Sequence, residues 1–287
     1  MLIVDQNTGS FERSTGKLSK AAVRHTEAAK MFLRRLSPAQ NRLIASLPAE
    51  VYERVLPNLW PVTLSQGENI YASGSRLEHV YFPTGAVVSL LYTTEDGATA
   101  EVGITGNDGM LGIALVLGGD SAPNRAIVQI AGGALKLGAG VLQEEFARGG
   151  AFQKLLLRYT QSFLTQVSQT AVCNRLHSVE KRLCRWLLLC HDRVHSDRLT
   201  ITQEFISNML GTRRESVTVA AARLQDAGLI HYSRGNITIL DRPGLESIGC
   251  ECYRTIKGEF DRLVGLRLPT VSEHGFRAPQ KPSQQVP

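Results

Sequence analysis

Residues 202–224 read TQEFISNMLGTRRESVTVAAARL, a pattern that predicts two helices joined by a tight turn. Thr202 can cap the first helix, because its hydroxyl can accept a hydrogen bond from a free N–H of the first turn. Gly211 can end this helix in the left-handed conformation. Apolar residues repeat at the spacing of a single helix face in both segments: Phe205, Ile206, Met209 and Leu210 in the first, and Val217, Ala221 and Leu224 in the second.

The second helix is predicted to begin near Arg213 or Arg214 and to expose its polar N-terminal end. Arginines and a carboxylate at that end, directly after a helix and a glycine turn, are typical of a recognition helix that enters a DNA major groove. An ordinary helical hairpin with solvated charges gives the same short pattern, so this segment alone leaves both interpretations open.

The residues that follow predict a β-hairpin. Ala227-Gly228-Leu229-Ile230 ends a helix and begins a strand, and residues 231–233 and 236–240 form two short runs around Arg234-Gly235. A helix-turn-helix followed by a hairpin is a winged helix, which favours DNA binding over the simple helical hairpin.

This region resembles the DNA-binding domain of the cyclic-AMP receptor/fumarate-nitrate regulator (Crp/Fnr) family. The matching positions are Thr202-Gln203-Glu204, Leu210-Gly211, Arg214-Glu215-Ser216-Val217, Arg223-Leu224, Gly228-Leu229-Ile230, Arg234-Gly235 and Ile239-Leu240-Asp241-Arg242. The resemblance implies an α+β protein with an N-terminal double-stranded β-roll of the cyclic-nucleotide-binding type, a long dimerisation helix and a C-terminal winged helix-turn-helix. It also implies a cytoplasmic homodimer that binds a palindromic operator in double-stranded DNA and contacts RNA polymerase.

The resemblance further implies which residues contact DNA. Arg214 corresponds to an arginine that binds a guanine edge, and Glu215 to a glutamate that accepts from a cytosine amino group. The family's third base-reading arginine falls at Val219, so the operator is expected to differ from the family's in sequence. The full set of expected DNA-binding residues is Thr202, Gln203, Arg213, Arg214, Glu215, Ser216, Thr218 and Arg234.

The charge of the chain lies mainly at its two ends. The formal net charge is +6; residues 1–40 carry seven lysines and arginines against three acids, and residues 266–287 carry three against one. These two segments hold +4 and +2, so the 225 residues between them are neutral as a whole. DNA binding must therefore be argued from the placement of charges and not from bulk charge.

Short β-rich runs alternate with turn signals between residues 59 and 139, and Glu95-Asp96-Gly97 is typical of a hairpin turn. The sequence predicts a flexible tail over residues 1–37, a sensory β-roll over 38–150, a dimerisation helix over 151–177, the winged helix-turn-helix over 178–265 and a disordered tail over 266–287. No run of apolar residues is long enough to span a membrane, and the beginning of the chain lacks a signal-peptide core, which favours the cytoplasm.

The pocket segment departs from the family pattern. Nucleotide-binding members have a Gly-Glu pair whose glutamate binds the ribose; here Gly109 is followed by Met110, which cannot accept a hydrogen bond from a ribose hydroxyl. The phosphate-binding arginine is replaced by Asn124, and Arg125 falls one residue late, which turns its side chain to the other face of a strand. Cyclic AMP is therefore not the expected ligand; a filled pocket and a different small effector are the alternatives.

Residues 151–174 form one long helical pattern with a stripe of residues at spacings of three and four. The stripe can pack on the β-roll or on the helix of a second copy. We expect Leu155 and Leu164 to face the roll and the stripe to face the partner, through Phe152, Leu156, Tyr159, Phe163 and Val167.

The five cysteines, Cys173, Cys184, Cys190, Cys250 and Cys252, are an odd number without a regular framework, which is typical of reduced thiols. The absence of cysteines near the N-terminus argues against the iron–sulfur cluster of some family members. An unbroken helix would align Cys173, His177, Cys184 and His191, but the resemblance places a hinge near residues 176–178. Cys250 and Cys252, two apart on a helix, would point in different directions. The sequence therefore predicts no metal site.

The sequence distinguishes among three functional classes. A transcription regulator fits the winged helix, whereas a small-molecule-binding regulatory module without DNA activity is the alternative that leaves the wing and the Arg214-Glu215 pair unexplained. The sequence contains no nucleophile elbow, phosphate-binding loop or metal-ligand cluster of known spacing, so no enzyme activity is expected.

Overall fold

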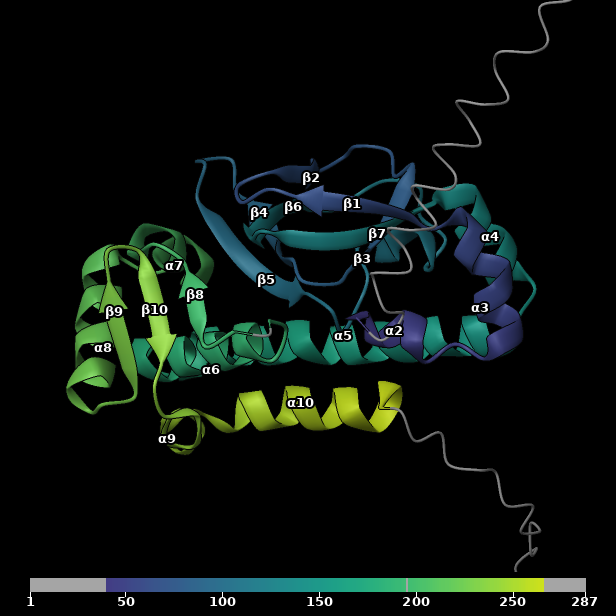
Figure 1. Cartoon of the computed structure of the whole chain (residues 1–287). Helices are drawn as coiled ribbons and strands as arrows, with labels where there is room; N and C mark the ends of the chain where they lie inside the picture. The colour runs from purple at the N-terminus through teal and green to yellow at the C-terminus, as the bar shows by residue number, and fades with distance from the viewer. Residues whose placement is uncertain (1–39, 195, 266–287) are drawn as a thin grey trace, which may run out of the picture.

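The computed structural model describes residues 40–194 and 196–265 (Figure 1). The two tails predicted at residues 1–37 and 266–287 lie outside the described residues. The described chain forms a β-roll and a helical region with a small second sheet, and the long helix α5 (Gly150–Leu176) runs beneath the roll toward that region. Among the described residues, no helix has the length and apolar character needed to cross a membrane.

The β-roll consists of two antiparallel sheets. One has the order β1(Trp60–Leu64), β7(Gly132–Gly138), β3(His79–Pro83), and the other has the order β2(Asn69–Tyr71), β6(Arg125–Ile130), β4(Val87–Thr93), β5(Thr99–Thr105). Alternate residues of these strands point into a shared core; Val80, Phe82 and Val128 are fully buried there. The predicted turn at Asp96-Gly97 joins β4 to β5, with Gly97 at a φ of 86°.

Short helices close the roll at its ends. They are α2(Arg42–Ala45), α3(Ala49–Val55), η2(Leu56–Asn58), η3(Ile113–Leu115) and α4(Ala139–Ala147). Asn41 fixes α2 to the roll, because its side chain caps the helix and also donates to the carbonyls of Pro83 and Gly109.

The C-terminal region begins at a break in the helical path. α5 ends at Leu176, His177 is extended, and Ser178 caps α6(Val179–His191) through its hydroxyl. The region continues through β8(Arg198–Thr200), α7(Gln203–Leu210), α8(Arg214–Asp226), β9(Ile230–Ser233), β10(Asn236–Ile239), α9(Arg242–Ile248) and α10(Glu251–Val264). The break at residues 177–178 agrees with the hinge that the resemblance implies.

The last helix, α10, returns along α5 and packs against it (Figure 1). Cys252, Tyr253, Ile256, Phe260 and Val264 form its buried face, at helical spacings. Phe260 and Val264 join the core of the β-roll, and Arg42 both stacks on the Phe260 ring and pairs with Asp261 at 3.2 Å. The C-terminal region is thus attached to the roll at both of its ends.

A buried polar chain lies where α6 packs on the sheet that contains β4, β5 and β6. Ser89 Oγ lies 2.7 Å from Glu101 Oε2 and 2.8 Å from Gln129 Oε1, and the Gln129 amide donates to Cys190 Sγ of α6. The Ser89 hydroxyl has a single proton to share between these two oxygens. Burial raises the pKa of Glu101 to about 7, and this effect outweighs the Ser89 hydrogen bond and the Arg185 charge, which lower it.

We expect Glu101→Gln to become progressively more stable than the wild-type protein as the pH rises from about 5 to about 8. Unfolded Glu101 ionises near its ordinary pKa, whereas the folded group holds its proton until about pH 7. The folded state therefore binds more protons in this range, and wild-type stability falls with rising pH, by up to about 3 kcal/mol from this group. Urea unfolding at several pH values measures the difference; a difference that does not change with pH would contradict the assignment.

Candidate nucleic-acid interface

The helix-turn-helix has the geometry that its sequence predicts. Thr202 Oγ1 accepts from the N–H of Phe205 at 3.2 Å, and Gly211 ends α7 in the left-handed conformation with a φ of 55°. The Thr212 N–H then donates to the Ser207 carbonyl, which closes the turn before α8 begins at Arg214. Val217, Ala220, Ala221 and Leu224 form the buried face of α8.

The N-terminal end of α8 presents its polar residues to solvent. Arg213, Arg214, Glu215 and Thr218 are exposed, and Ser216 is half-buried. Within the described part of the chain, neither Arg213 nor Arg214 forms an ion pair. Their guanidinium groups are thus available as donors, at the positive end of a helix that also favours phosphate.

The two helices of the motif are joined by a side-chain contact. Thr218 Oγ1 donates to Gln203 Oε1 at 2.9 Å, and it lies 3.1 Å from the Arg214 carbonyl. The structure therefore brings Gln203, from the start of α7, to the exposed face of α8, where six of the predicted residues gather.

The wing is a tight hairpin between β9 and β10. Arg234 and Gly235 form its two-residue loop, both with positive φ, at 45° and 79°. Two consecutive positive φ values define the primed turn that matches the twist of paired strands, and Gly235 supplies the conformation at no steric cost. Gly235 packs near Thr202, so the exposed Arg234 lies at the same end of the domain as the cap of α7.

The segment expected to hold an effector surrounds only a small cavity. Its volume is about 20 Å³, and its lining includes Met110, Asn124, Tyr159 and Phe163. A cavity needs roughly 10–15 Å³ to hold one water molecule and several hundred to hold a drug-sized ligand. In this conformation the roll is filled, and Tyr159 helps to fill it by donating to the Met110 carbonyl at 3.0 Å.

Asn124, which directly precedes β6, lines the cavity, whereas Arg125, the first residue of β6, does not. Ala126 and Val128 point into the core, so Arg125 belongs to the opposite face of the strand and is absent from the cavity lining, as the alternation of strand residues predicts. Gly109 is buried under Tyr159, whose ring leaves no room for a side chain there. Of the four predicted pocket residues, Met110 and Asn124 line the cavity, Gly109 lies beside them, and Arg125 does not take part.

The stripe of α5 expected to face a partner instead packs on the β-roll. Phe152, Leu156, Tyr159 and Phe163 are at most 8% exposed and belong to the core of the roll, and Val167 packs beside them. The prediction that Leu164 faces the roll is also wrong, because Leu164 is 51% exposed, whereas Leu155 does pack against that core. Helical spacing identifies residues that share a face, but it does not say which neighbour covers that face.

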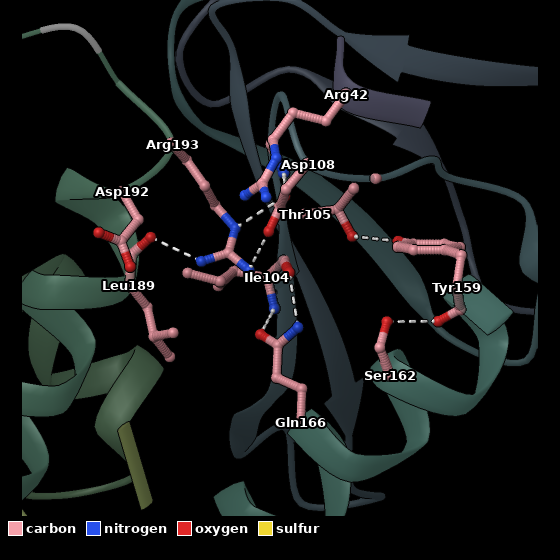
Figure 2. Close-up of polar contacts among 12 residues, drawn as sticks. Arg42, Ile104, Thr105, Asp108, Tyr159, Ser162, Gln166, Leu189, Asp192 and Arg193 are labelled. Atoms are coloured by element: carbon pink, nitrogen blue, oxygen red, sulfur yellow. Dashed lines mark hydrogen bonds and ion pairs between the residues drawn. The ribbon is translucent and has the colours of Figure 1, made fainter. Parts of the chain in front are cut away.

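A network of polar contacts joins the cavity segment, α5 and α6 (Figure 2). Arg193, just after α6, pairs with Asp108 at 2.6 Å, and a second nitrogen donates to the other carboxylate oxygen at 3.1 Å. Gln166 of α5 exchanges two hydrogen bonds with the backbone of Ile104. Asp108 directly precedes Gly109-Met110, so the cavity is connected through one buried ion pair to the helix that leads into the DNA-binding region.

The sequence does not predict this network. Arg193 and Asp108 are 85 residues apart and carry no shared motif. The only available signal was Asp108 beside the atypical Gly109-Met110 pair, and it did not indicate a partner.

The helix pair α7 and α8 and the hairpin of β9 and β10 define a class of domain, the winged helix-turn-helix. The comparisons give the type: residues 181–248 match the family model described as the Crp-like helix-turn-helix domain. The resemblance to the Crp/Fnr family that the sequence predicts is confirmed for this part of the chain. No match was found among curated proteins.

Solved structures share the fold. FixK2 from Bradyrhizobium japonicum aligns with a TM-score of 0.59 and 17% identity over 67% of this chain and 98% of its own. A putative Crp/Fnr-family transcriptional regulator from Eubacterium rectale gives 0.56 and 19%, over 72% of this chain and 96% of its own. The c-di-GMP-responsive regulator CLP from Xanthomonas campestris gives 0.53 and 18%, over 67% and 99% respectively. The predicted fold class is confirmed, and neither the family model nor these structures indicate an enzymatic family.

Proposed function

We propose that this protein is a homodimeric, sequence-specific transcription regulator whose β-roll senses an effector. The observation that supports it best is the exposed polar N-terminal end of α8, where Arg213 and Arg214 form no ion pair with the described residues, beside a wing that carries Arg234. A major groove admits an α-helix and offers acceptor and donor edges to arginine and carboxylate side chains. The protein acts by binding, without catalysis, and we place it in the cytoplasm with its DNA.

Each residue has a proposed role at the interface. Arg214 donates to a guanine edge, and Glu215 accepts from a cytosine amino group. Thr202, Gln203, Ser216, Arg213, Thr218 and Arg234 contact or lie near phosphates, which set the register without reading sequence. Val219, 52% exposed on the same face, can contact a thymine methyl group but cannot replace an arginine.

Selection of bound duplexes from a random library tests this proposal. A homodimer should enrich one motif with twofold symmetry, with half-sites about one helical turn apart. From the family resemblance we also propose that the protein contacts RNA polymerase, which is a separate point from this selection. If no motif is enriched and every duplex binds equally weakly, the proposal of a sequence-specific regulator is contradicted.

The dimer is proposed to form through the exposed face of α5. Leu157, Leu164 and Val172 are 46%, 51% and 42% exposed there, although they lie on a helix whose other faces are covered by the roll and by α10. Residues seven and eight apart lie on one face of a helix, so these three side chains form a single exposed apolar strip. This face replaces the Phe163 face predicted from the sequence.

Leu164→Glu should convert the dimer into monomers and abolish operator binding. In a twofold dimer two glutamates would be buried near each other without partners, at a cost of several kcal/mol. Sedimentation velocity measures the oligomeric state. Leu117→Glu, at a site 61% exposed outside α5, is the matched control and should remain dimeric. A dimeric Leu164→Glu protein would show that another surface holds the copies together.

Cyclic AMP is proposed not to be the effector. Met110 lines the cavity where a ribose partner would be needed, Arg125 lies outside it, and the cavity of about 20 Å³ does not admit a nucleotide in this conformation. Calorimetric titration with cyclic AMP should show no saturable binding at micromolar concentrations; clear saturation there would overturn this part of the proposal.

A further inference from the structure

Four potential metal ligands converge where α5 ends and α10 begins. Cys173 and His177 come from the last turn of α5 and the residue after it, Cys250 precedes α10, and Cys252 lies in its first turn. Their ligand atoms all lie within 4.8 Å of one another. Cys173 Sγ is 3.5 Å from Cys250 Sγ, and Cys252 Sγ is 3.6 Å from His177 Nδ1.

The separations of 3.5 and 3.6 Å match those around a single tetrahedral ion. With Zn–S bonds of about 2.3 Å and Zn–N bonds of about 2.0 Å, neighbouring ligand atoms lie roughly 3.5–3.8 Å apart. A cluster of several irons needs wider spacing, since metal ions and sulfides separate its ligands. We propose that Cys173, His177, Cys250 and Cys252 bind one Zn²⁺ ion.

The site is enclosed. The three cysteines are at most 3% exposed, and the His177 side chain is 14% exposed. Four protein ligands leave no open coordination position, which is typical of a structural zinc site and not of a catalytic one.

The surroundings of His177 support this assignment independently. His177 Nε2 lies 3.5 Å from a carboxylate oxygen of Glu251. A proton on Nε2 that points to Glu251 leaves Nδ1, the atom that faces Cys252, as the free ligand. A carboxylate that orients a histidine in this way is the usual second partner of a zinc-bound imidazole.

The charges nearby also fit. Three thiolates and Zn²⁺ carry a net charge of −1. Arg182 and Arg185 of α6, 9% and 2% exposed, lie within electrostatic reach of Cys173. Within the described residues neither arginine forms an ion pair, and the Nε of each lacks a hydrogen-bond partner. An anionic zinc centre provides the compensating charge that buried arginines require.

Zinc at this position would hold the end of α5 and the start of α10 together, next to the break at residues 177–178. α5 supports the β-roll, whereas α10 follows the DNA-binding region, so the ion would hold the two regions in one arrangement. The inference rests on the ligand cluster and not on the proposed function, because metal content can be measured without DNA.

Elemental analysis of the full chain, purified with a thiol reductant and desalted, tests the proposal. About one zinc ion per chain is expected. Cys173→Ser and Cys252→Ser should lose the ion, whereas Cys184→Ser, which alters an equally buried cysteine outside the cluster, should retain it. His177→Cys should also retain the ion, since four thiolates are an equally good ligand set. Zinc retained by both cluster serine variants would overturn the proposal.

Two measurements on the wild-type chain need no variant. Co²⁺ should give the intense visible bands and the near-ultraviolet thiolate band of tetrahedral coordination by sulfur. Zinc should also slow alkylation of Cys173, Cys250 and Cys252 at least tenfold, as followed by mass spectrometry, without slowing that of Cys184. A Cys173–Cys250 disulfide in lysates quenched with acid, or octahedral cobalt spectra, would overturn the proposal.

Discussion

Arg193→Ala is expected to lower the free energy of unfolding by about 3–5 kcal/mol, because it leaves the Asp108 carboxylate buried without its partner. Arg193 is 4% exposed, and its pair with Asp108 has two nitrogen–oxygen contacts at 2.6 and 3.1 Å. The lost side chain also removes a donor from the Leu189 carbonyl. Urea unfolding gives the value.

Arg148→Ala is the matched control for that experiment. Arg148 pairs with Glu145 at 3.0 Å, but its side chain is 61% exposed, so the loss should be below about 1 kcal/mol. The double variant Asp108→Asn/Arg193→Met should recover much of the stability, because it removes both charges together. Equal losses for Arg193→Ala and Arg148→Ala would show that the buried pair contributes no more than a surface pair.

The helix-turn-helix could be predicted residue by residue because its signals are local. The Thr202 cap, the left-handed Gly211 and the Arg234-Gly235 turn each depend on the conformational preferences of a few consecutive residues. The alternation of strand residues likewise predicted that Arg125 lies outside the cavity, since a shift of one residue in a strand turns the side chain to the other face.

The faces of α5 could not be predicted in the same way. The apolar stripe through Phe163 and the one through Leu164 have similar helical spacing, and only the packed structure shows that the aromatic side chains fill the roll. Leu157, Leu164 and Val172 are exposed because α10 covers a different side of α5. No local sequence pattern indicates this packing.

The cysteine cluster was missed for a related reason. Two cysteines within one helix, at the spacing of Cys250 and Cys252, would point in different directions. Cys250 instead precedes α10 in an extended conformation, which lets both thiols reach the end of α5. The partners Cys173 and His177 are more than 70 residues away, and their approach depends on the whole C-terminal region.

The second large effect is expected at the recognition helix. Arg214→Ala should weaken binding to the selected operator by about 1–3 kcal/mol, roughly 5- to 150-fold, because a bidentate contact with guanine is lost. Arg214 is exposed and caps nothing, so the variant should fold as the wild type does. Ser216→Ala, which removes the proposed phosphate contact, should weaken specific and random binding by similar factors.

The most direct test of sequence-specific binding is therefore the ratio of the affinity for the operator to the affinity for random DNA. Fluorescence anisotropy gives the affinities of wild-type and Arg214→Ala protein for the selected operator and for a random duplex, at one salt concentration. The predicted result is a large loss on the operator and a loss several times smaller on random DNA, so that the specificity ratio falls. Equal losses on both duplexes would contradict the account, because Arg214 would then contact only phosphate and α8 would not read the major groove as proposed.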